Sequence, residues 1–563
     1  MATLSSPDPR RNGTGNKPGM NTLFNLDYGR EVPFNNLMKQ SRDFWYRNSN
    51  DAFDGTLDSN GYITDPGTAV SHNQVVIISG SAANMLPHGN YVLTWSGTGT
   101  CEIVTTGTIA KSTVSTAANR IVYNITDWGD ADLVYLRVPI ASTDVTDVVF
   151  CHEDYEGTCG PGEADEFYQE FLDAYAPYTG GIRFMNWQAT NQKDGWDSWS
   201  TRKPESYRTY THGGFDGGTG RNAEPGIPLE VCIRAQNKLG IPGWYCIPHE
   251  YDDASVETFC DTLASGVDNE LKVVVEYSNE TWNGGFPQNA YCETQGDAEH
   301  AASGRFANAG GGFTHWQWAA YRATQCMDIA RASFASRLDD LVTVLGLQVG
   351  SAESRKALDV DVAVNFGVDT PILAYTKFDA ASPAFYWGNT TLMEPQWSNN
   401  GAADNDAGSL RDSATKNTIN MTKEEVYQWW ESTYADYESD VLESTSWAYW
   451  VDEVKTQRGL EMLGYEGQHH VVTVGSVQGN ASAEAIVDYY EEERFGDLTR
   501  DWILDAERIG FDTLFHFVLI ESDSEQGGYW GLVPTYTALA DQSTYQRYRG
   551  VREATGQNNK RGI

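Results

Sequence analysis

The sequence predicts an α/β fold: a (β/α)8 TIM barrel with an inserted antiparallel β-sandwich-like domain. Two observations lead to this prediction. From about residue 165 onward, short apolar runs alternate with amphipathic helical segments, which is typical of a parallel sheet with helical crossovers. Between residues 59 and 150, short β-rich runs are instead separated by turns rich in Gly, Asn and Ser, which indicates antiparallel strands.

Counting one strand near residue 25, eight strands are expected, nearly all followed by helices, and eight such units predict a closed barrel. The predicted parts are a flexible arm (1–21), the first strand and helix of the barrel (22–58), the inserted β-rich domain (59–150), the remainder of the barrel (151–540) and a C-terminal tail (541–563). The insertion would therefore interrupt the barrel after its first helix.

The later barrel elements follow from their hydrophobic pattern. Strands are predicted at 181–188, 243–249, 271–280, 341–348, 371–378, 460–468 and 511–522. Helices are predicted at 165–178, 228–240, 254–267, 314–334 and over much of 422–459. A further short segment, 353–363, lies between two of the strands.

The composition is strongly acidic, with 78 Asp and Glu against 39 Lys and Arg and a formal net charge of -39. Nucleic acids and anionic membranes are therefore poor partners, because phosphate binding needs clustered cations. The acidic residues are scattered, which predicts a solvated surface and resembles the halophilic-like composition of proteins from salty habitats. The 18 Trp and 30 Tyr suit stacking against sugars as well as an ordinary core.

No apolar stretch is long enough for a membrane helix, and the first twenty residues lack the apolar region of a secretory signal. A cytoplasmic location, export by another route and association with a particle all stay open. The eight cysteines contain no CxxC pair, so no metal site is expected. Cys151 and Cys159 could close a small disulfide loop or stay as thiols.

Two glutamates stand where chemistry is expected in such a barrel, at the carboxyl ends of strands. Glu280 follows the run "VVVEYSN", and Glu466 follows "EMLGY". Hydrolysis of a glycosidic bond needs one carboxyl that donates a proton and one that stays ionised and attacks the anomeric carbon. We expect Glu280 to be the acid/base and Glu466 the nucleophile. The competing interpretations are a surface glutamate and a salt bridge at a strand end.

Further residues near the strand ends are expected to bind substrate. Asn279 would contact a sugar hydroxyl, tryptophans would stack on sugar rings, and Tyr375 would orient Glu466. Arg183 would keep a catalytic carboxylate ionised or form a structural ion pair. The predicted substrate-binding residues are Asn279, Trp282, Arg183, Trp187, Asn191, Trp196, His249, Tyr375, His469, Glu521 and Trp530.

These motifs resemble the clan A glycoside hydrolases, which carry an Asn-Glu acid/base after strand 4 and a glutamate nucleophile after strand 7 of a (β/α)8 barrel. The stretches "RFMNWQATN", "GWYCIPHEYDD", "VEYSNETWN", "YEGQHH" and "YWGL" are also similar to a little-characterised group of bacterial proteins, some labelled cellulose-binding. The resemblance spans residues 22 to 535. It implies a retaining mechanism and a β-linked glycan as substrate.

The sequence thus predicts a retaining glycoside hydrolase that acts on a β-linked oligosaccharide or polysaccharide without a cofactor or metal. Two alternatives use the same barrel: a carbohydrate-binding protein with little or no activity, and a structural protein of a cell surface or virion. A shared fold does not decide between these classes. Loss of turnover with retained glycan binding in Glu280→Gln and Glu466→Gln would identify the enzyme.

Overall fold

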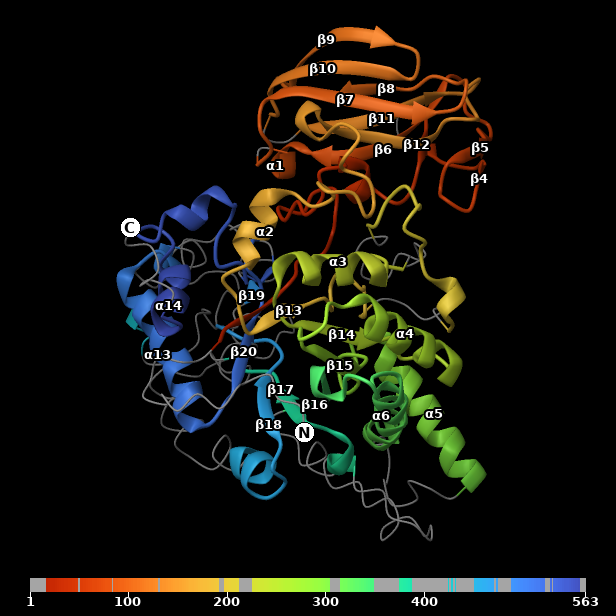
Figure 1. The fold of residues 1–563 in the computed structure, drawn as a ribbon. Coiled ribbons are helices and arrows are strands. Elements are labelled where there is room, and N and C mark those ends of the chain that lie inside the picture. The colour runs from red at the N-terminus through yellow and green to blue at the C-terminus, as the bar shows by residue number, and fades with distance from the viewer. Residues whose placement is uncertain are drawn as a thin grey trace, which may run out of the picture.

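The computed structural model shows a β-sandwich (red to orange) next to a barrel whose strands are surrounded by helices (Figure 1). The described residues are 17–48, 51–83, 85–129, 132–191, 197–211, 225–303, 314–348, 374–386, 424, 427–428, 431, 450–469, 472–473, 488–521, 527–528 and 530–556.

Eight parallel strands form one closed barrel in the order β1-β13-β14-β15-β16-β17-β18-β20, which confirms the predicted fold class. The strands are β1 (Gly19–Asn21), β13 (Gly181–Arg183), β14 (Gly243–Ile247), β15 (Val273–Tyr277), β16 (Leu341–Leu347), β17 (Ala380–Pro383), β18 (Glu461–Gly464) and β20 (Thr513–His516). Because all of them run in the same direction, their carboxyl ends meet at one rim.

Apolar β-branched residues explain how β15 forms the barrel wall. All of its residues are buried, and successive side chains point to opposite faces of the strand. Val274 packs inside the barrel in one cluster with Trp244 and Phe515. Val273 and Val275 belong to the larger cluster that lies beneath the outer helices. A strand buried on both faces is what a continuous apolar run predicts.

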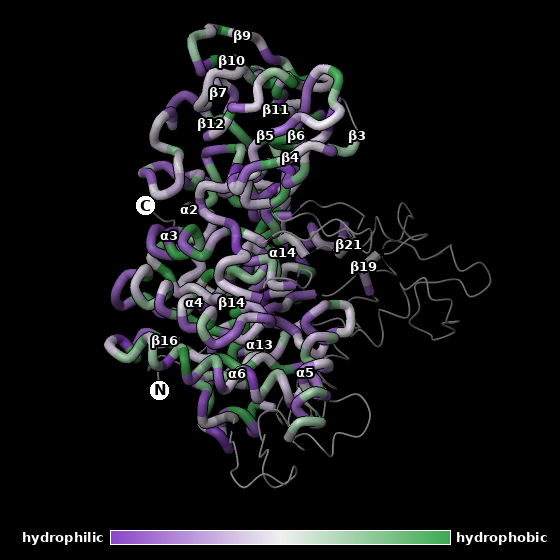
Figure 2. Tube along the Cα trace, turned by 90° about the vertical axis from the view of Figure 1, so that its right-hand side faces the viewer, coloured by the Kyte–Doolittle hydropathy of each residue, from purple (hydrophilic) through white to green (hydrophobic). Residues whose placement is uncertain are grey.

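Helices cover the outside of the barrel, and hydrophobic and hydrophilic residues alternate along them (Figure 2). They are α2 (Gln169–Tyr175), α3 (Leu229–Leu239), α4 (Asp253–Gly266), α5 (Pro287–Ser303), α6 (Thr314–Ser333), α13 (Glu493–Ile509) and α14 (Gln546–Ala554). The Asp252 carboxylate caps α4 by accepting a hydrogen bond from the Ser255 amide at 2.8 Å. Gly240, with a φ of 64°, ends α3 in the left-handed conformation that favours glycine.

The inserted domain consists of two antiparallel sheets, with strand orders β12-β7-β10-β9 and β3-β2-β6-β11-β8. Their strands are β2 (Tyr46–Arg47), β3 (Asp51–Ala52), β6 (His72–Ser79), β7 (Gly89–Ser96), β8 (Glu102–Thr105), β9 (Ala110–Ala117), β10 (Arg120–Asp127), β11 (Leu133–Pro139) and β12 (Thr146–His152). A separate two-stranded sheet joins β4 (Thr56–Leu57) to β5 (Ile63–Asp65). The two sheets enclose a core that includes Leu93 and Leu136.

The start and end of the barrel differ from the predicted boundaries. The first strand is Gly19–Asn21 and not a strand near residue 25, and residues 37–40 form a short 3-10 helix. The segment "GMN" lacks a β-branched run, so its sequence gives little strand signal. A Cβ at Gly19 would lie 2.5 Å from the Phe515 ring, so close packing requires glycine there. Helix α14 lies in the predicted C-terminal tail and packs against α13.

The sixth barrel strand was also predicted in the wrong place. Residues 374–377 of the predicted strand 371–378 form a 3-10 helix, and the strand is β17, Ala380–Pro383. Its sequence, "AASP", is small and carries a proline, which obscures it in a hydrophobicity pattern. The segment 353–363 and most of 422–459 lie outside the described residues.

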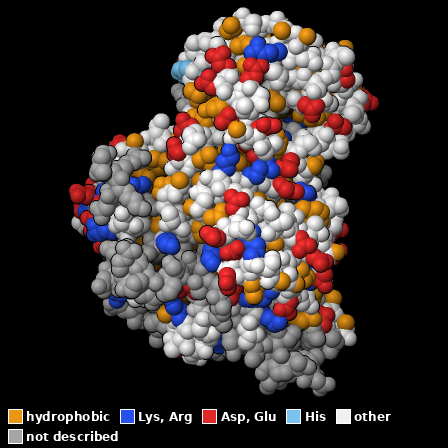
Figure 3. All heavy atoms as spheres, viewed as in Figure 1, with side chains coloured by type: hydrophobic (Ala, Val, Ile, Leu, Met, Phe, Trp, Pro, Cys, Tyr) orange, Lys and Arg blue, Asp and Glu red, His pale blue; other side chains and the backbone are white. Residues whose placement is uncertain are grey.

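Acidic and basic side chains are interspersed on the face shown in Figure 3, as the scattered charges of the sequence predict. None of the helices in the described ranges is long and apolar enough to span a bilayer. Cys151 and Cys159 are buried and carry free thiols in the structure, so the disulfide between them stays a prediction.

Candidate active site

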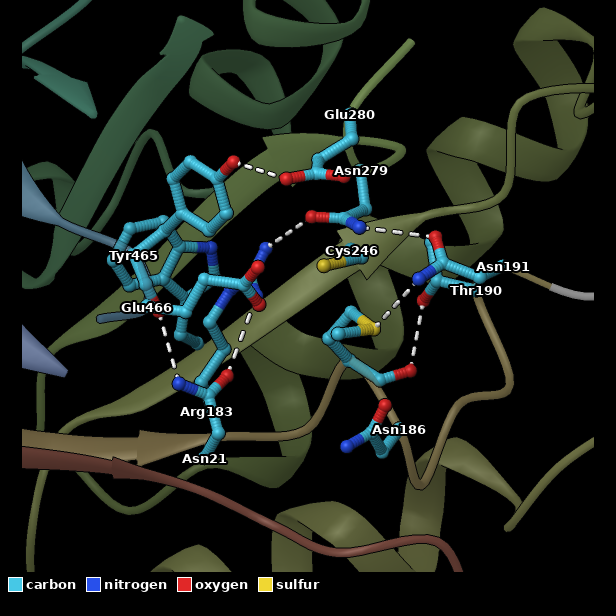
Figure 4. Close-up of polar contacts among 12 residues, drawn as sticks. Asn21, Arg183, Asn186, Thr190, Asn191, Cys246, Asn279, Glu280, Tyr465 and Glu466 are labelled. Carbon is cyan, nitrogen blue, oxygen red and sulfur yellow. Dashed lines mark hydrogen bonds and ion pairs between the residues drawn. The ribbon is translucent and has the colours of Figure 1, made fainter. Parts of the chain in front are cut away.

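The two predicted catalytic glutamates lie on loops at the carboxyl-terminal rim of the barrel. Glu280 follows β15, and Glu466 follows β18. Figure 4 shows both side chains close to Arg183, the last residue of β13. The negative charge of Glu280 acts on Glu466 strongly enough to raise its pKa. The structure therefore brings together residues that are far apart in the sequence.

Arg183 is the fully buried centre of this group (Figure 4). Its Nη2 donates hydrogen bonds to Glu276 Oε2 at 2.9 Å and to Asn279 Oδ1 at 2.8 Å. Its Nη1 donates to Asn21 Oδ1 at 3.3 Å and lies 3.8 Å from Glu466 Oε2. One guanidinium group thus links three barrel strands and two carboxyl groups.

Aromatic rings fix the arginine in place. The guanidinium carbon of Arg183 lies 5.1 Å from the Trp244 ring centroid and 5.0 Å from that of Tyr465. The Trp244 indole also donates a hydrogen bond to Glu276 Oε2 at 3.0 Å. A cation held by ring faces and by ion pairs has little freedom to reorient, so the site is preorganised.

Asn279 joins the arginine to the neighbouring loop. Its Nδ2 donates to Asn191 Oδ1 at 3.0 Å. Gln288 Nε2 donates to the same Asn191 oxygen and to the Asn279 carbonyl, both at 2.7 Å. Asn191 and Asn279 therefore lie in the site, where the amide of Asn279 bonds to protein groups and keeps one N–H available for another acceptor.

Glu280 has an unusual backbone conformation, with a φ of 39°. Positive φ is rare for non-glycine residues and costs about 1–3 kcal/mol, so the surrounding contacts must hold it. The Tyr465 hydroxyl donates to Glu280 Oε1 at 2.5 Å, and Asn283 Nδ2 donates to Oε2 at 2.8 Å. Both carboxyl oxygens therefore accept hydrogen bonds.

Glu466 lies deeper, with 8% of its surface exposed. Burial and then the negative charge of Glu280 raise the pKa of Glu466 to about 8, against the opposing effects of Arg183 and of a hydrogen bond from Tyr386. Near neutral pH the unliganded pair of Glu280 and Glu466 therefore retains a proton, and the raised pKa favours Glu466 as its holder. This differs from the expectation that Glu466 is ionised while its partner carries the proton.

Tyr386 occupies the position that the sequence analysis gave to Tyr375. Tyr386 follows β17 at the carboxyl rim, and its side chain hydrogen-bonds to Glu466. Tyr375 lies in the 3-10 helix before β17, at the opposite end of that strand. The prediction for Tyr375 is wrong because the strand was placed too early. The run "ASPAFY" carries the missed signal: a strand with a tyrosine just after it.

Trp282 forms part of the wall beside Glu280. It stacks on Trp316 of α6 with ring centroids 5.0 Å apart and an interplanar angle of 8°. These rings, Glu276 and Glu280 line a cavity of about 20 Å³, together with Gly346 and other residues of β16 and α6. That volume holds roughly one water molecule and no sugar ring.

Two predicted substrate-binding residues are instead part of the protein interior. Trp187 is 1% exposed and packs between Phe34 and Phe171, so it offers no face to a sugar. His469 is 2% exposed and packs on Tyr490 with ring centroids 4.5 Å apart. Both predictions are wrong because these side chains pack against other aromatic rings in the protein interior.

The remaining predicted substrate-binding residues differ in their burial and contacts. His249 is buried, with its ring 5.1 Å from that of Tyr291 in an edge-to-face contact. Glu521 and Trp530 are half-buried and adjacent, and Glu521 Oε2 accepts a hydrogen bond from the Trp530 amide at 3.2 Å. Their roles stay predictions. Trp196 lies outside the described residues.

The sequence analysis missed Glu276 and did not assign a role to Tyr465. Glu276 could have been predicted to face the barrel interior. Side chains alternate between the two faces of a strand, and Glu276 lies two positions after the inward-facing Val274. A charged residue in a buried strand needs a partner, and here that partner is Arg183. Among the described residues, no group of three His, Cys, Asp or Glu side chains is placed to hold a metal ion.

Comparison with known proteins gives only remote similarity. No protein-family model matches the chain, and no curated protein matches its sequence. A β-glucosidase from Thermotoga maritima, solved with deoxynojirimycin, is 11% identical with a TM-score of 0.31, covering 69% of this chain and 86% of its own. A β-galactosidase from the Antarctic haloarchaeon Halorubrum lacusprofundi is 12% identical with a TM-score of 0.33, covering 70% of this chain and 56% of its own.

These solved structures are β-glycosidases, but scores this low support no transfer of their activity. The closed barrel is established by the strand order of this chain itself. The resemblance to bacterial proteins labelled cellulose-binding stays a prediction.

Proposed function

We propose that this protein is a retaining glycoside hydrolase acting on a β-linked glycan through Glu280 and Glu466. The observation that supports this best is the position of Glu280 and Glu466 after β15 and β18 at one barrel rim, close enough for the charge of Glu280 to raise the pKa of Glu466. A pair that shares one proton can supply both a donor and a nucleophile. The site needs no cofactor for this reaction.

The surroundings of the two carboxyls support different roles. Glu466 lies deep beside Arg183 and Tyr386, which can fix its oxygen below the anomeric carbon. Glu280 is half-buried beside Trp282, where a leaving group could depart toward solvent. Before the first step, the proton shared by the pair must pass from Glu466 to Glu280. Ionised Glu466 then forms a bond to the anomeric carbon while the bond from that carbon to the leaving oxygen breaks, and Glu280 donates the proton to this oxygen. In the second step, Glu280 takes a proton from the water that releases the sugar.

A glycan panel tests this proposal directly. We expect the wild type to hydrolyse at least one member of a set of aryl β-glycosides and β-linked polysaccharides, and Glu466→Gln to bind it without turnover. Proton NMR of the first product should show the β anomer, because two displacements restore the configuration. An α anomer would establish inversion. Binding without hydrolysis by the wild type would favour a carbohydrate-binding protein.

The pH dependence gives a second expectation. kcat/KM should fall as pH rises through about 8, the pKa of Glu466, because the pair then loses its shared proton. In Glu280→Gln, the pKa of Glu466 should fall, since a nearby negative charge is removed. A wild-type rate that stays constant up to about pH 10 would contradict a pair that titrates in this way.

A further inference from the structure

Glu276 is a third carboxyl in the site, and the neighbouring strand leaves room for it. It is 2% exposed and lies on β15, three residues before Asn279. A Cβ at Gly346 of β16 would stand 2.6 Å from Glu276 Oε1. Glycine at this position therefore admits the carboxyl group between the two strands.

Glu276 and Glu466 both contact the same arginine, and Glu276 has the closer contact. Arg183 Nη2 is 2.9 Å from Glu276 Oε2, whereas Nη1 is 3.8 Å from Glu466 Oε2. The Trp244 indole, at 3.0 Å, donates to the same Glu276 oxygen and fixes it. The guanidinium group is thus held at the Glu276 side of the site.

We infer that Glu276 is a positioning residue that holds the Arg183 guanidinium and prevents it from forming a close, two-pronged ion pair with Glu466. Such a pair would occupy both Glu466 oxygens and stabilise the carboxylate strongly. With Arg183 shared, an oxygen of Glu466 stays available to attack carbon. Only this catalytic consequence rests on the proposed function; the sharing of Arg183 does not.

The charge of Glu276 should also keep the carboxylate of Glu466 from being strongly stabilised. A second buried carboxylate next to Arg183 offsets part of the guanidinium charge that Glu466 would otherwise experience. In agreement, Glu276 contributes to the raised pKa of Glu466. Burial also raises the pKa of Glu276 itself, while Arg183 and Trp244 oppose this shift. Glu276 therefore influences Glu466 through both the position and the effective charge of Arg183.

The test is the pKa of Glu466 in Glu276→Gln, measured by carbon NMR of protein labelled at glutamate side-chain carboxyls. The signal of Glu466 is identified by its absence in Glu466→Gln. Glutamine keeps the shape but removes the charge, so Arg183 can move to Glu466. We expect the pKa of Glu466 to fall by about one unit or more. An unchanged or higher pKa would overturn the inference.

Two further variants guard against a folding effect. Trp244→Phe removes the indole donor but no charge, and a smaller fall in the pKa of Glu466 is expected. Glu31→Gln is the control: Glu31 is also a buried carboxyl, with a pKa raised to about 8, but its hydrogen bonds come from Tyr175, Trp187 and the Leu23 amide. This control should leave the pKa of Glu466 unchanged. If the pKa of Glu466 shifts as much in Glu31→Gln as in Glu276→Gln, the shift comes from losing any buried carboxyl and not from Glu276 in particular.

The measurement separates this inference from the proposed function. If no glycan is hydrolysed, the NMR titration still shows whether Glu276 controls Glu466. If the protein is active, the basic limb of its kcat/KM profile should move to lower pH in Glu276→Gln by the same amount as the pKa. A lower kcat/KM with an unmoved limb and an unmoved pKa would assign Glu276 a structural role only.

Discussion

Glu466→Gln is expected to lower kcat/KM on an activated aryl β-glycoside by about 10⁴-fold, which corresponds to about 5.5 kcal/mol of lost transition-state stabilisation. Glutamine cannot form the covalent glycosyl intermediate, although it fills the same space. Initial rates at saturating and limiting substrate measure this loss. A variant that keeps most of its activity would exclude Glu466 as nucleophile.

The fold should survive this substitution. Burial and Glu280 raise the pKa of Glu466 from an unfolded value near 4.5 to about 8. The folded state therefore binds this proton more tightly, and its contribution to stability is lost as pH rises through about 8. Glutamine mimics the protonated carboxyl at every pH. The variant should therefore gain stability relative to wild type as pH rises from about 4.5 to about 8. Urea denaturation at several pH values checks this.

Azide rescue separates the roles of the two glutamates. In Glu466→Ala, azide can enter the vacated space and attack in one displacement, so an α-glycosyl azide is expected. In Glu280→Ala, the glycosyl-enzyme still forms from a substrate with a good leaving group, and azide then gives a β-glycosyl azide. Because the unliganded site holds its proton on Glu466, the reverse pattern of products would show that the two residues exchange roles.

Arg183→Met is expected to destabilise the protein by about 3–5 kcal/mol at a pH near 8. Arg183 is completely buried and is the ion-pair partner of Glu276 and Glu466. Its removal leaves two buried carboxyls without a cation, so both can fold only with a proton bound. The expected loss is therefore smaller near pH 5, where solution protons neutralise them at lower cost.

A surface pair provides the matched control. Arg120 forms a two-pronged ion pair with Glu156 on the sandwich, but both side chains are exposed to solvent. Arg120→Met should change the free energy of unfolding very little, because exposed ion pairs contribute little to stability. If Arg183→Met loses as much stability near pH 5 as near pH 8, the loss comes from packing and not from unpaired charge.

The architecture could be predicted where local pattern and burial agree. Val273–Tyr277 is a mainly apolar strand with one charged residue, Glu276, and the Asn-Glu after it lies at the rim as expected. Amphipathic segments such as 228–240 and 254–267 became α3 and α4 almost residue for residue. In these segments, hydrophobic periodicity alone determines the element.

The site could be predicted only in part, because its geometry depends on long-range contacts. Strand β17 consists of small residues, so the strand was assigned to the more apolar run before it and Tyr375 was chosen in place of Tyr386. Trp187 lies close to a strand end like a binding residue, yet its indole packs against Phe34 and Phe171. Sequence spacing shows which loop carries a residue, but the direction of the side chain depends on partners elsewhere in the chain.

Closure of the barrel has a consequence for biosynthesis. Met20 of the first strand pairs with His516 of the last, and the Asn21 amide donates to the carbonyls of Tyr465 and His516. A nascent chain must therefore reach its final strand before Asn21 can reinforce Arg183. Ribosome-bound fragments that end before residue 513 should contain both glutamates and yet lack β20, so the network around Arg183 should stay incomplete until that strand has been made.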